Sequence, residues 1–329
     1  MHPQLFAIPM PFGWNPFTVA WYGVLITLGV LIGAIIAQRM AEKRGLNANL
    51  LSDMTVWVVA WGVVGARIMY IATSPGQFIG TDFFHWINIR EGGISIHGGV
   101  IAGIMVILYY QRRYKINFYH YADLMVPGLA LGVIGGRIGN FFNGSDTMGR
   151  VTGWPVGFTW PEIGSPILGI FTGEKNWAGM PGLCLKGDVW DVSGPLGCVG
   201  GQLSRGPVHL TQIYGAVIGL ILVIASIYWL RSKRPGWATW QFILWYSLLR
   251  SVFEETFRLN PLTPKIFLSE GANAAGIGLL TATQLASIPL VILSIYMLVR
   301  ISRRPIPPET SSSMPIMTGP PSPSNVQGA

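Results

Sequence analysis

Seven stretches of this chain are apolar over the length that a helix needs to cross a lipid bilayer. About 20 apolar residues are required, and each backbone polar group must be bonded within its own segment because lipid offers no partner. Half of the 329 residues are hydrophobic and only 11% are charged, which is typical of an all-α integral membrane protein. The predicted spans are 16–37, 51–73, 94–111, 119–142, 208–230, 238–257 and 281–299.

Lysine and arginine are concentrated in alternate loops between these spans. Basic clusters follow the first, third, fifth and seventh spans, and the other connections carry few basic residues. The positive-inside rule places such clusters in the cytoplasm. We therefore expect the N-terminus outside and the C-terminus inside. Much of the net charge of +8 then reflects topology, and no nucleic-acid partner is expected.

Two segments lie outside the predicted spans. The connection 144–206 is rich in Gly, Pro and Trp, lies on the outer face and is long enough to form a folded cap. Its Cys184 and Cys198 favour a disulfide over a metal site or a nucleophile, because no further ligand residue lies at suitable spacing. The predicted units are membrane helices at 1–143, the external cap at 144–206, membrane helices at 207–300 and a disordered, Pro- and Ser-rich cytoplasmic tail at 301–329.

Polar side chains within the spans gather in one layer. Spans of opposite direction all place them in the outer half of the membrane, so we expect a polar cavity that opens toward the outer leaflet. Tyr246, Arg250 and Glu254 are spaced by four and are expected to share one helix face. The polar residues of the layer are Tyr22, Arg67, His97, Arg137, Asn140, Asn143, His209, Gln212, Tyr214, Tyr246, Arg250 and Glu254.

Up to three arginines in this cavity, Arg67, Arg137 and Arg250, would need an anionic partner. Glu254 offers one for Arg250, and a phosphate group suits the others because its oxygens match a guanidinium fork. His97 is the candidate proton-transfer group, since the unperturbed pKa of histidine is about 6.5. The implied ligand is a phospholipid headgroup that enters sideways from the membrane.

Several of these residues also have structural interpretations. For Arg137 and Arg250 a functional role is favoured over a structural ion pair, and Tyr246 is expected to bond within the bundle. Arg67 would equally well extend toward the membrane interface, and His97 would equally well bond between packed helices. His209 is expected to be structural. Two pairs of glycines in the fourth span favour close helix packing, whereas Gly98 and Gly99 are expected to leave room for a substrate. The pairs are Gly132 with Gly136 and Gly135 with Gly139.

Six blocks of the sequence carry a more specific signal. They are "WYG" in the first span, "GARIMY" in the second, "GGISIHGG" before the third, "GRIGNFFNG" at the end of the fourth, "HLTQIY" in the fifth and "YSLLRSVFEETFR" in the sixth. In order and spacing they resemble the bacterial prolipoprotein diacylglyceryl transferase family, and the resemblance covers residues 16–300.

The resemblance implies a multi-pass enzyme of the bacterial inner membrane, with its active site and a folded head on the periplasmic side. The implied reaction moves the diacylglyceryl group of phosphatidylglycerol to the lipobox cysteine of a prolipoprotein signal peptide. It forms a thioether and releases glycerol phosphate, as the first step of lipoprotein maturation. The expected partners are phosphatidylglycerol, prolipoproteins and membrane lipids, and neither a metal nor an organic cofactor is expected.

Taken position by position, the resemblance implies roles for individual residues. It makes Arg137 and Arg250 catalytic residues that bind the headgroup, and His97 the candidate general base. A thiol with an unperturbed pKa of about 8.5 must lose its proton, and the leaving phosphate needs its charge stabilised. Further functional positions of the family match Tyr22, Asn140, Tyr246, Glu254 and Gly149, and headgroup contacts are also expected from Asn140, Gly98, Gly99 and Gly149.

The sequence departs from the family pattern in three blocks, and in the sixth block an extra residue before Arg258 limits the match to the part that ends at Glu254. Ser145 and Asp146 stand where the family usually has a glutamate, so Asp146 is a candidate replacement at a shifted register. Leu210 takes the place of a proline after His209, and Gly215 takes the place of a glutamate. These changes weaken a functional role for His209.

Two other classes of protein would also gather arginines in a membrane cavity. A transporter for an anionic solute would more often show internal repeats and polar groups on both sides of the midplane, whereas the inner halves of these spans are almost purely apolar. A non-catalytic binder of an anionic lipid would need the arginines but not His97.

Overall fold

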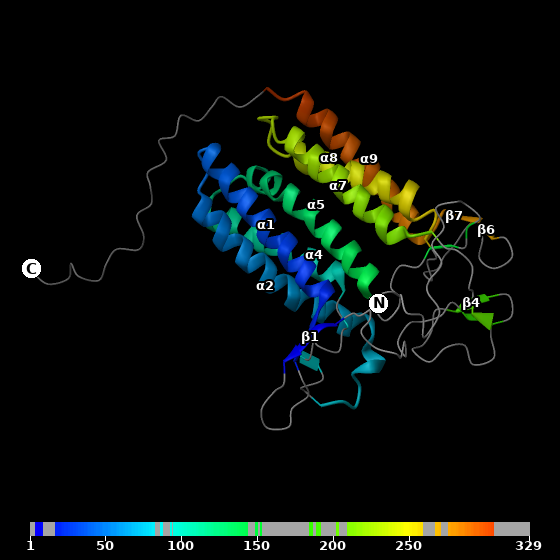
Figure 1. Ribbon diagram of the computed structural model, residues 1–329. Coiled ribbons are helices and arrows are strands. Elements are labelled where there is room, and N and C mark those ends of the chain that lie inside the picture. Colours follow the sequence, from blue (N-terminus) through cyan, green and yellow to red (C-terminus); the bar gives the residue numbers. More distant parts are fainter. Residues whose placement is uncertain are drawn as a thin grey trace, which may run out of the picture.

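The computed structural model is a bundle of long helices with short strands at one end, which we call the head end (Figure 1). The bundle consists of α1 (Trp21–Lys43), α2 (Ala48–Thr73), α4 (Ile96–Tyr114), α5 (Phe118–Asn143), α7 (Thr211–Trp229), α8 (Trp237–Leu249) and α9 (Ala282–Ser302). The structure describes residues 4–8, 17–82, 86–87, 93, 95–143, 149–150, 152, 184–186, 189–191, 202–203, 209–258, 267–270 and 276–305.

Three small antiparallel sheets lie at the head end. β1 pairs with β2, β6 pairs with β7, and β3 lies between β4 and β5. The strands are β1 (Gln4–Ile8), β2 (Phe17–Ala20), β3 (Cys184–Lys186), β4 (Val189–Asp191), β5 (Gln202–Leu203), β6 (Phe267–Glu270) and β7 (Gly276–Leu279). Cys184 belongs to β3, and Cys198 lies outside the described residues, so the disulfide stays a prediction.

The chain is a helical membrane protein, because α1, α2, α5, α7 and α9 are each long and apolar enough to cross a membrane. α4 carries two arginines in its last turn, and α8 has only 13 residues. The predicted start of the first span at residue 16 is wrong, because Phe17–Ala20 form β2. The sixth span is α-helical only to Leu249 and continues as a π-helical turn, Arg250–Glu254.

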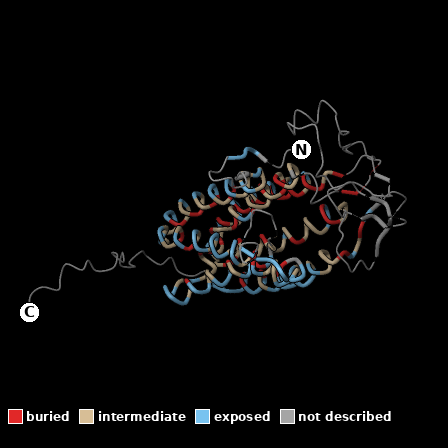
Figure 2. Tube along the Cα trace, turned by 90° about the horizontal axis from the view of Figure 1, so that it is seen from below, coloured by how far each residue is buried: buried red, intermediate tan, exposed pale blue. Residues whose placement is uncertain are grey.

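α5 lies at the centre of the bundle, between α1 on one side and α7 on the other, while α2 with α4 and α8 with α9 form outer pairs. Leu51, Leu124 and Leu222 belong to the buried apolar core. Figure 2 shows buried positions along the inside of the bundle and exposed positions along its outward faces. Those outward faces carry exposed apolar side chains such as Val56 and Ile224, which suit contact with lipid.

Glycine allows α5 to approach α1 closely on one of its two predicted small-residue faces. A Cβ atom added to Gly135 would lie 2.5 Å from a backbone carbonyl oxygen of α1, and one added to Gly139 would lie 2.7 Å from the ring of Tyr22. A Cβ atom at Gly132 or Gly136 would have nothing within 4 Å. The packing role is therefore seen for the second pair and not for the first.

Replacing Gly135 by alanine should lower the stability of the folded protein, because the new methyl group forces the α1 and α5 backbones apart. Overpacking of this kind costs about 1–3 kcal/mol. The matched change Gly136→Ala, with open space around it, should leave stability unchanged or raise it slightly, since alanine is the better helix former. Thermal unfolding of both variants in detergent measures the difference, and equal melting temperatures would contradict the close α1–α5 contact.

At the end opposite the head, Asp123 of α5 caps the first turn of α8. Its carboxylate accepts hydrogen bonds at 2.8 Å from the backbone N–H groups of Gly236 and Thr239, and at 2.6 Å from the Thr239 hydroxyl. The first N–H groups of a helix have no partner within the helix, so this carboxylate satisfies them. The cap fixes the position of α8 along α5. It therefore also sets the level at which the C-terminal end of α8 lies beside α5.

Candidate active site

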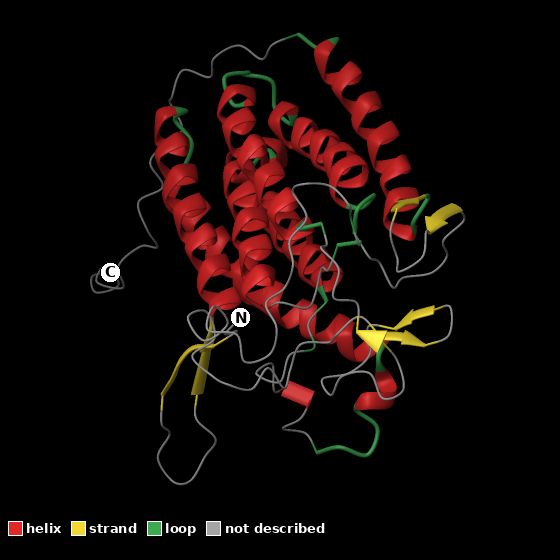
Figure 3. Cartoon of the chain, turned by 45° about the vertical axis from the view of Figure 1, so that its right-hand side comes forward, coloured by secondary structure: helices red, strands yellow, loops and turns green. Residues whose placement is uncertain are grey.

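The polar residues expected in one layer lie at the head end of the bundle. α2, α5 and α8 end there, and α1, α4, α7 and α9 begin there (Figure 3). Arg137 and Asn140 lie in the last two turns of α5, Arg250 follows α8 directly, and Tyr22 is the second residue of α1. Antiparallel helices therefore bring these side chains to a common level.

Arg137 and Glu254 form a buried ion pair between α5 and the π-helical turn. The guanidinium Nη2 of Arg137 lies 2.5 Å from Oε1 of Glu254, and the two side chains are 9% and 1% exposed. Glu254 was expected to pair with Arg250, but its close contact is with Arg137, and its interaction with Arg250 is electrostatic. Within the π-turn the N–H of Glu255 bonds to the carbonyl of Arg250 at 2.8 Å, five residues back, so the spacing of an α-helix does not apply.

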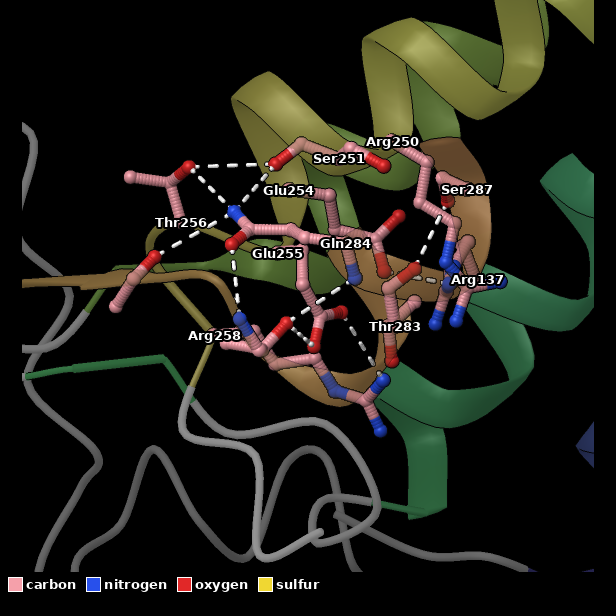
Figure 4. A network of polar contacts seen from close by, with 12 residues as sticks. Arg137, Arg250, Ser251, Glu254, Glu255, Thr256, Arg258, Thr283, Gln284 and Ser287 are labelled. Atoms are coloured by element: carbon pink, nitrogen blue, oxygen red, sulfur yellow. Dashed lines mark hydrogen bonds and ion pairs between the residues drawn. The ribbon is translucent and has the colours of Figure 1, made fainter. Parts of the chain in front are cut away.

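Arg250 lies beside this pair and is held by its own helix. Its Nη1 donates a hydrogen bond of 2.8 Å to the hydroxyl of Tyr246, one turn earlier, as expected for a bond within the bundle. The Glu254 carboxylate interacts electrostatically with both Arg137 and Arg250, whose side chains are shown in Figure 4. The buried Nε of Arg250 has no hydrogen-bond partner among the described residues. Two guanidinium groups thus share one carboxylate, which leaves an excess positive charge.

Gly215 of α7 covers the ion pair with its backbone. A Cβ atom at this position would lie 2.6 Å from Oε2 of Glu254 and 2.8 Å from Nε of Arg137. The departure from the family pattern at Gly215 therefore has a structural consequence. No side chain separates α7 from the pair, and Glu254 is the carboxylate that contacts Arg137.

The change Gly215→Ala should displace Arg137 or Glu254 and lower the activity of the site by about 10- to 100-fold, because misplacing a catalytic group by about 1 Å costs that much. Gly132→Ala, with nothing within 4 Å of the added atom, is the matched control and should keep the wild-type rate. Both rates are to be measured for the reaction that the family resemblance implies. A fully active Gly215→Ala enzyme would show that this geometry does not matter for the reaction.

A second polar cluster fixes the start of α9 against the π-turn. The carboxylate of Glu255, which is fully buried, lies 3.6 Å from Arg258 and accepts a bond of 3.3 Å from the Thr281 hydroxyl. Gln284 donates at 2.9 Å to the carbonyl of Ser251, and it forms a capping box with Thr281 at the first turn of α9 (Figure 4). Burial lowers the pKa of the Arg258 guanidinium, against the opposing effect of Glu255.

Gly149, Arg150 and His209 lie against the residues that follow the π-helical turn. Gly149 forms an isolated bridge with Arg258, and the N–H of Arg150 bonds to the carbonyl of Phe257 at 2.8 Å. A Cβ atom at Gly149 would collide with the backbone carbonyl of His209, which explains the glycine. The His209 ring lies 3.0 Å through Nδ1 from the Tyr214 hydroxyl and packs on Phe257. These contacts agree with a structural role for His209, and headgroup binding by Gly149 remains a prediction.

His97 and Arg67 lie on the α2–α4 side of the bundle. His97 is the second residue of α4 and is exposed, and no hydrogen bond within the described residues joins it to Arg137 or Arg250. Arg67 is buried. Its guanidinium donates to the backbone carbonyls of Trp86 and Gly93, at 2.8 and 2.9 Å, so it holds the connection that follows α2. Its described contacts are with this connection and with the ring of Phe78, and not with the Arg137–Glu254 pair.

The glycines beside His97 pack on α2. A Cβ atom at Gly98 would collide with the carbonyl of Gly65, and one at Gly99 would lie 3.3 Å from the carbonyl of Gly62. The space that we expected these glycines to leave for a substrate is occupied by the α2 backbone. Their predicted role in headgroup binding gains no support from these contacts, which favour helix packing instead.

Sequence reasoning missed part of the site. Glu255, Arg258 and Gln284 were not expected to cooperate, although the charged residues after Glu254 in an apolar chain were a usable signal. Asp146 lies outside the described residues, so its role as a replacement carboxylate stays a prediction. Among the residues that the structure describes, no group of three His, Cys, Asp or Glu side chains is placed to hold a metal ion.

Taken together, the fold and the site define a helical membrane protein with a buried, net positive arginine–glutamate centre at one end. Residues 9–300 match the model of the family described as prolipoprotein diacylglyceryl transferase. The chain belongs to this family of transferases, and the resemblance read from its motifs is confirmed.

Relatives of the same family are similar over most of their length. The phosphatidylglycerol–prolipoprotein diacylglyceryl transferase of Deinococcus radiodurans is 50% identical over 295 residues, covering 88% of this chain and 84% of the relative. The proteins of that name from Thermus thermophilus and Caldanaerobacter subterraneus are 47% and 30% identical, covering 88% and 90% of this chain and 96% and 95% of the relatives.

Proposed function

We propose that this protein transfers the diacylglyceryl group of phosphatidylglycerol to the lipobox cysteine of prolipoproteins. The observation that carries the proposal is the centre formed by Arg137, Arg250 and Glu254, which holds two guanidinium groups and one carboxylate at the head end. The names of the relatives give phosphatidylglycerol and prolipoprotein as the substrates of those enzymes. An anionic headgroup would supply the charge that this centre lacks.

In the proposed reaction the cysteine sulfur attacks the glyceryl carbon that carries the phosphate. A carbon–sulfur bond forms, the carbon–oxygen bond to phosphate breaks, and glycerol phosphate leaves with the electron pair. The thiol proton must pass to a base before or during the attack. No oxidant, reductant or cofactor enters this balance, so the protein has to provide a base and to stabilise negative charge.

Arg137 and Arg250 are the proposed phosphate ligands. Glu254 is the proposed positioning residue, since its carboxylate holds the Arg137 guanidinium in a fixed place between α5 and α7. A fixed donor costs no reorganisation when charge develops on the leaving oxygen. His97 is the proposed base, and Tyr22 and Asn140 complete the proposed site at the same end of the bundle.

The proposed topology has seven spans, with α4 and α8 counted beside the five longest apolar helices. Arg44, Arg113, Arg234 and Arg303 lie at or beyond the helix ends opposite the head, as the positive-inside rule requires of the cytoplasmic side. The head and the active site would then face the periplasm of a bacterial inner membrane. Residues 144–206 would contribute a cap, and the predicted segment 301–329, whose first two residues belong to α9, a cytoplasmic tail.

The test uses purified protein with phosphatidylglycerol labelled in an acyl chain and a lipobox peptide. Label that becomes attached to the peptide cysteine through a thioether, with release of glycerol phosphate, is the expected result. Lipid binding without transfer would instead favour the non-catalytic alternative. His97→Gln should lose most activity if His97 is the base, with His120→Gln at the other end of the bundle as the matched control. Full activity of His97→Gln would assign the base elsewhere.

A further inference from the structure

Gln212 is a buried amide that the residues around it do not satisfy. The residue is 1% exposed, and neither its Oε1 nor its Nε2 has a hydrogen-bond partner within the described residues. Leaving a buried donor or acceptor unpaired is unfavourable, and an apolar residue of the same shape would avoid that cost. A buried amide without a hydrogen-bond partner in the protein points to a ligand that supplies one.

The position of Gln212 relates it to the Arg137–Glu254 pair. Gln212, Gly215 and Gly219 follow the helix repeat along α7 and share the face that packs on α5. Gly215 touches the ion pair, and a Cβ atom at Gly219 would lie 2.7 Å from the side chain of Ile134 on α5. Gln212 therefore lies on the face of α7 that meets Arg137, one turn nearer to the head end.

The direction of the side chain adds to this placement. Side chains of a helix lean toward its N-terminus, and the N-terminus of α7 lies at the head end. The amide of Gln212 thus lies beyond the ion pair, on the side away from the middle of the bundle. A phospholipid whose phosphate meets Arg137 and whose acyl chains lie in the membrane would place its headgroup alcohol in the same direction.

We propose that Gln212 recognises the hydroxyl groups of the glycerol in the headgroup and so selects phosphatidylglycerol among phospholipids. The inference rests on the proposed function. An amide offers one acceptor oxygen and a donor NH2 group, and a hydroxyl group both donates and accepts, so the two can satisfy each other. An ammonium headgroup only donates and would leave the amide NH2 unpaired. Sites that bond a substrate hydroxyl discriminate strongly against analogues that lack it.

The experiment compares phosphatidylglycerol with phosphatidylpropanol, which keeps the phosphate and the chain length but has no headgroup hydroxyl. Wild-type protein should prefer phosphatidylglycerol in kcat/KM by roughly 10- to 100-fold, as expected for the loss of such hydrogen bonds. The variant Gln212→Met should bring this ratio close to one, chiefly because kcat/KM for phosphatidylglycerol falls. Gln241→Met on α8, where Gln241 bonds to Trp245, is the matched control and should keep the wild-type preference.

The melting temperature separates this role from a structural one, because replacing a residue with a structural role would lower it. Because the amide is unsatisfied, Gln212→Met should leave the melting temperature of the lipid-free protein unchanged or raise it. A wild-type preference retained by Gln212→Met would overturn the proposal, and so would a raised KM for the lipobox peptide with an unchanged lipid ratio. Failure of the wild-type protein to transfer from either lipid would instead overturn the proposed function.

Discussion

Replacing Arg137 by glutamine should reduce diacylglyceryl transfer by about 100- to 1000-fold, because in the proposed reaction the leaving phosphate loses a fixed guanidinium donor. The loss should appear in kcat as well as in KM, since the interaction strengthens as negative charge develops on the leaving oxygen. The same change leaves Glu254, which is 1% exposed, without its ion-pair partner. Removing one member of a buried pair costs about 3–5 kcal/mol, so stability should fall together with activity.

A double variant separates the two effects. Arg137→Gln with Glu254→Gln removes both charges and replaces the ion pair by two neutral amides, which should recover much of the lost stability. Activity should stay low, because the phosphate still lacks the Arg137 guanidinium. Thermal unfolding and the transfer assay are to be run on the same preparations. Recovery of activity in the double variant would show that Arg137 serves only to neutralise Glu254, and would contradict phosphate binding.

Hydropathy predicted the helices of the bundle because lipid imposes a minimum length of apolar sequence on each span. The fourth predicted span, 119–142, agrees with α5 at Phe118–Asn143. The first predicted span, 16–37, begins too early. The strand Phe17–Ala20 is as apolar as the helix that follows, and hydropathy over so short a segment does not separate strand from helix.

The position of the site along the bundle was predictable from the sequence. Which residues form its ion pair was not. Topology alone brings Arg137 and Glu254 to the same end of the bundle, since it requires only the direction of each span. The partner of Glu254 depends on the π-turn, which shifts one hydrogen bond from four residues to five and has no clear signature in sequence. The contact of Gly215 with the ion pair was not predictable from the sequence either, because it depends on how α7 packs on α5.

Replacing Arg250 by glutamine should also reduce transfer by about 100-fold or more, but for Arg250 the loss should come without a large loss of stability. Glu254 keeps its ion pair with Arg137 in this variant, so no buried carboxylate is left alone. Arg113→Gln is the matched control, because Arg113 also lies over a tyrosine ring, 5.5 Å from that of Tyr114, at the opposite end of the bundle. That control should keep the wild-type rate.

Tyr246→Phe tests how Arg250 is positioned. The change removes the hydroxyl that accepts the 2.8 Å bond from Arg250 but keeps the ring, whose centre lies 5.8 Å from the guanidinium carbon. A single hydrogen bond of this kind contributes about 1 kcal/mol, so a loss of roughly 5- to 10-fold is expected, well below that of Arg250→Gln. If Tyr246→Phe were as damaging as Arg250→Gln, the hydroxyl itself would act on the substrate.

If Arg250→Gln lowered stability as much as Arg137→Gln, Arg250 would share in neutralising Glu254, and its role as a second phosphate ligand would lose its support.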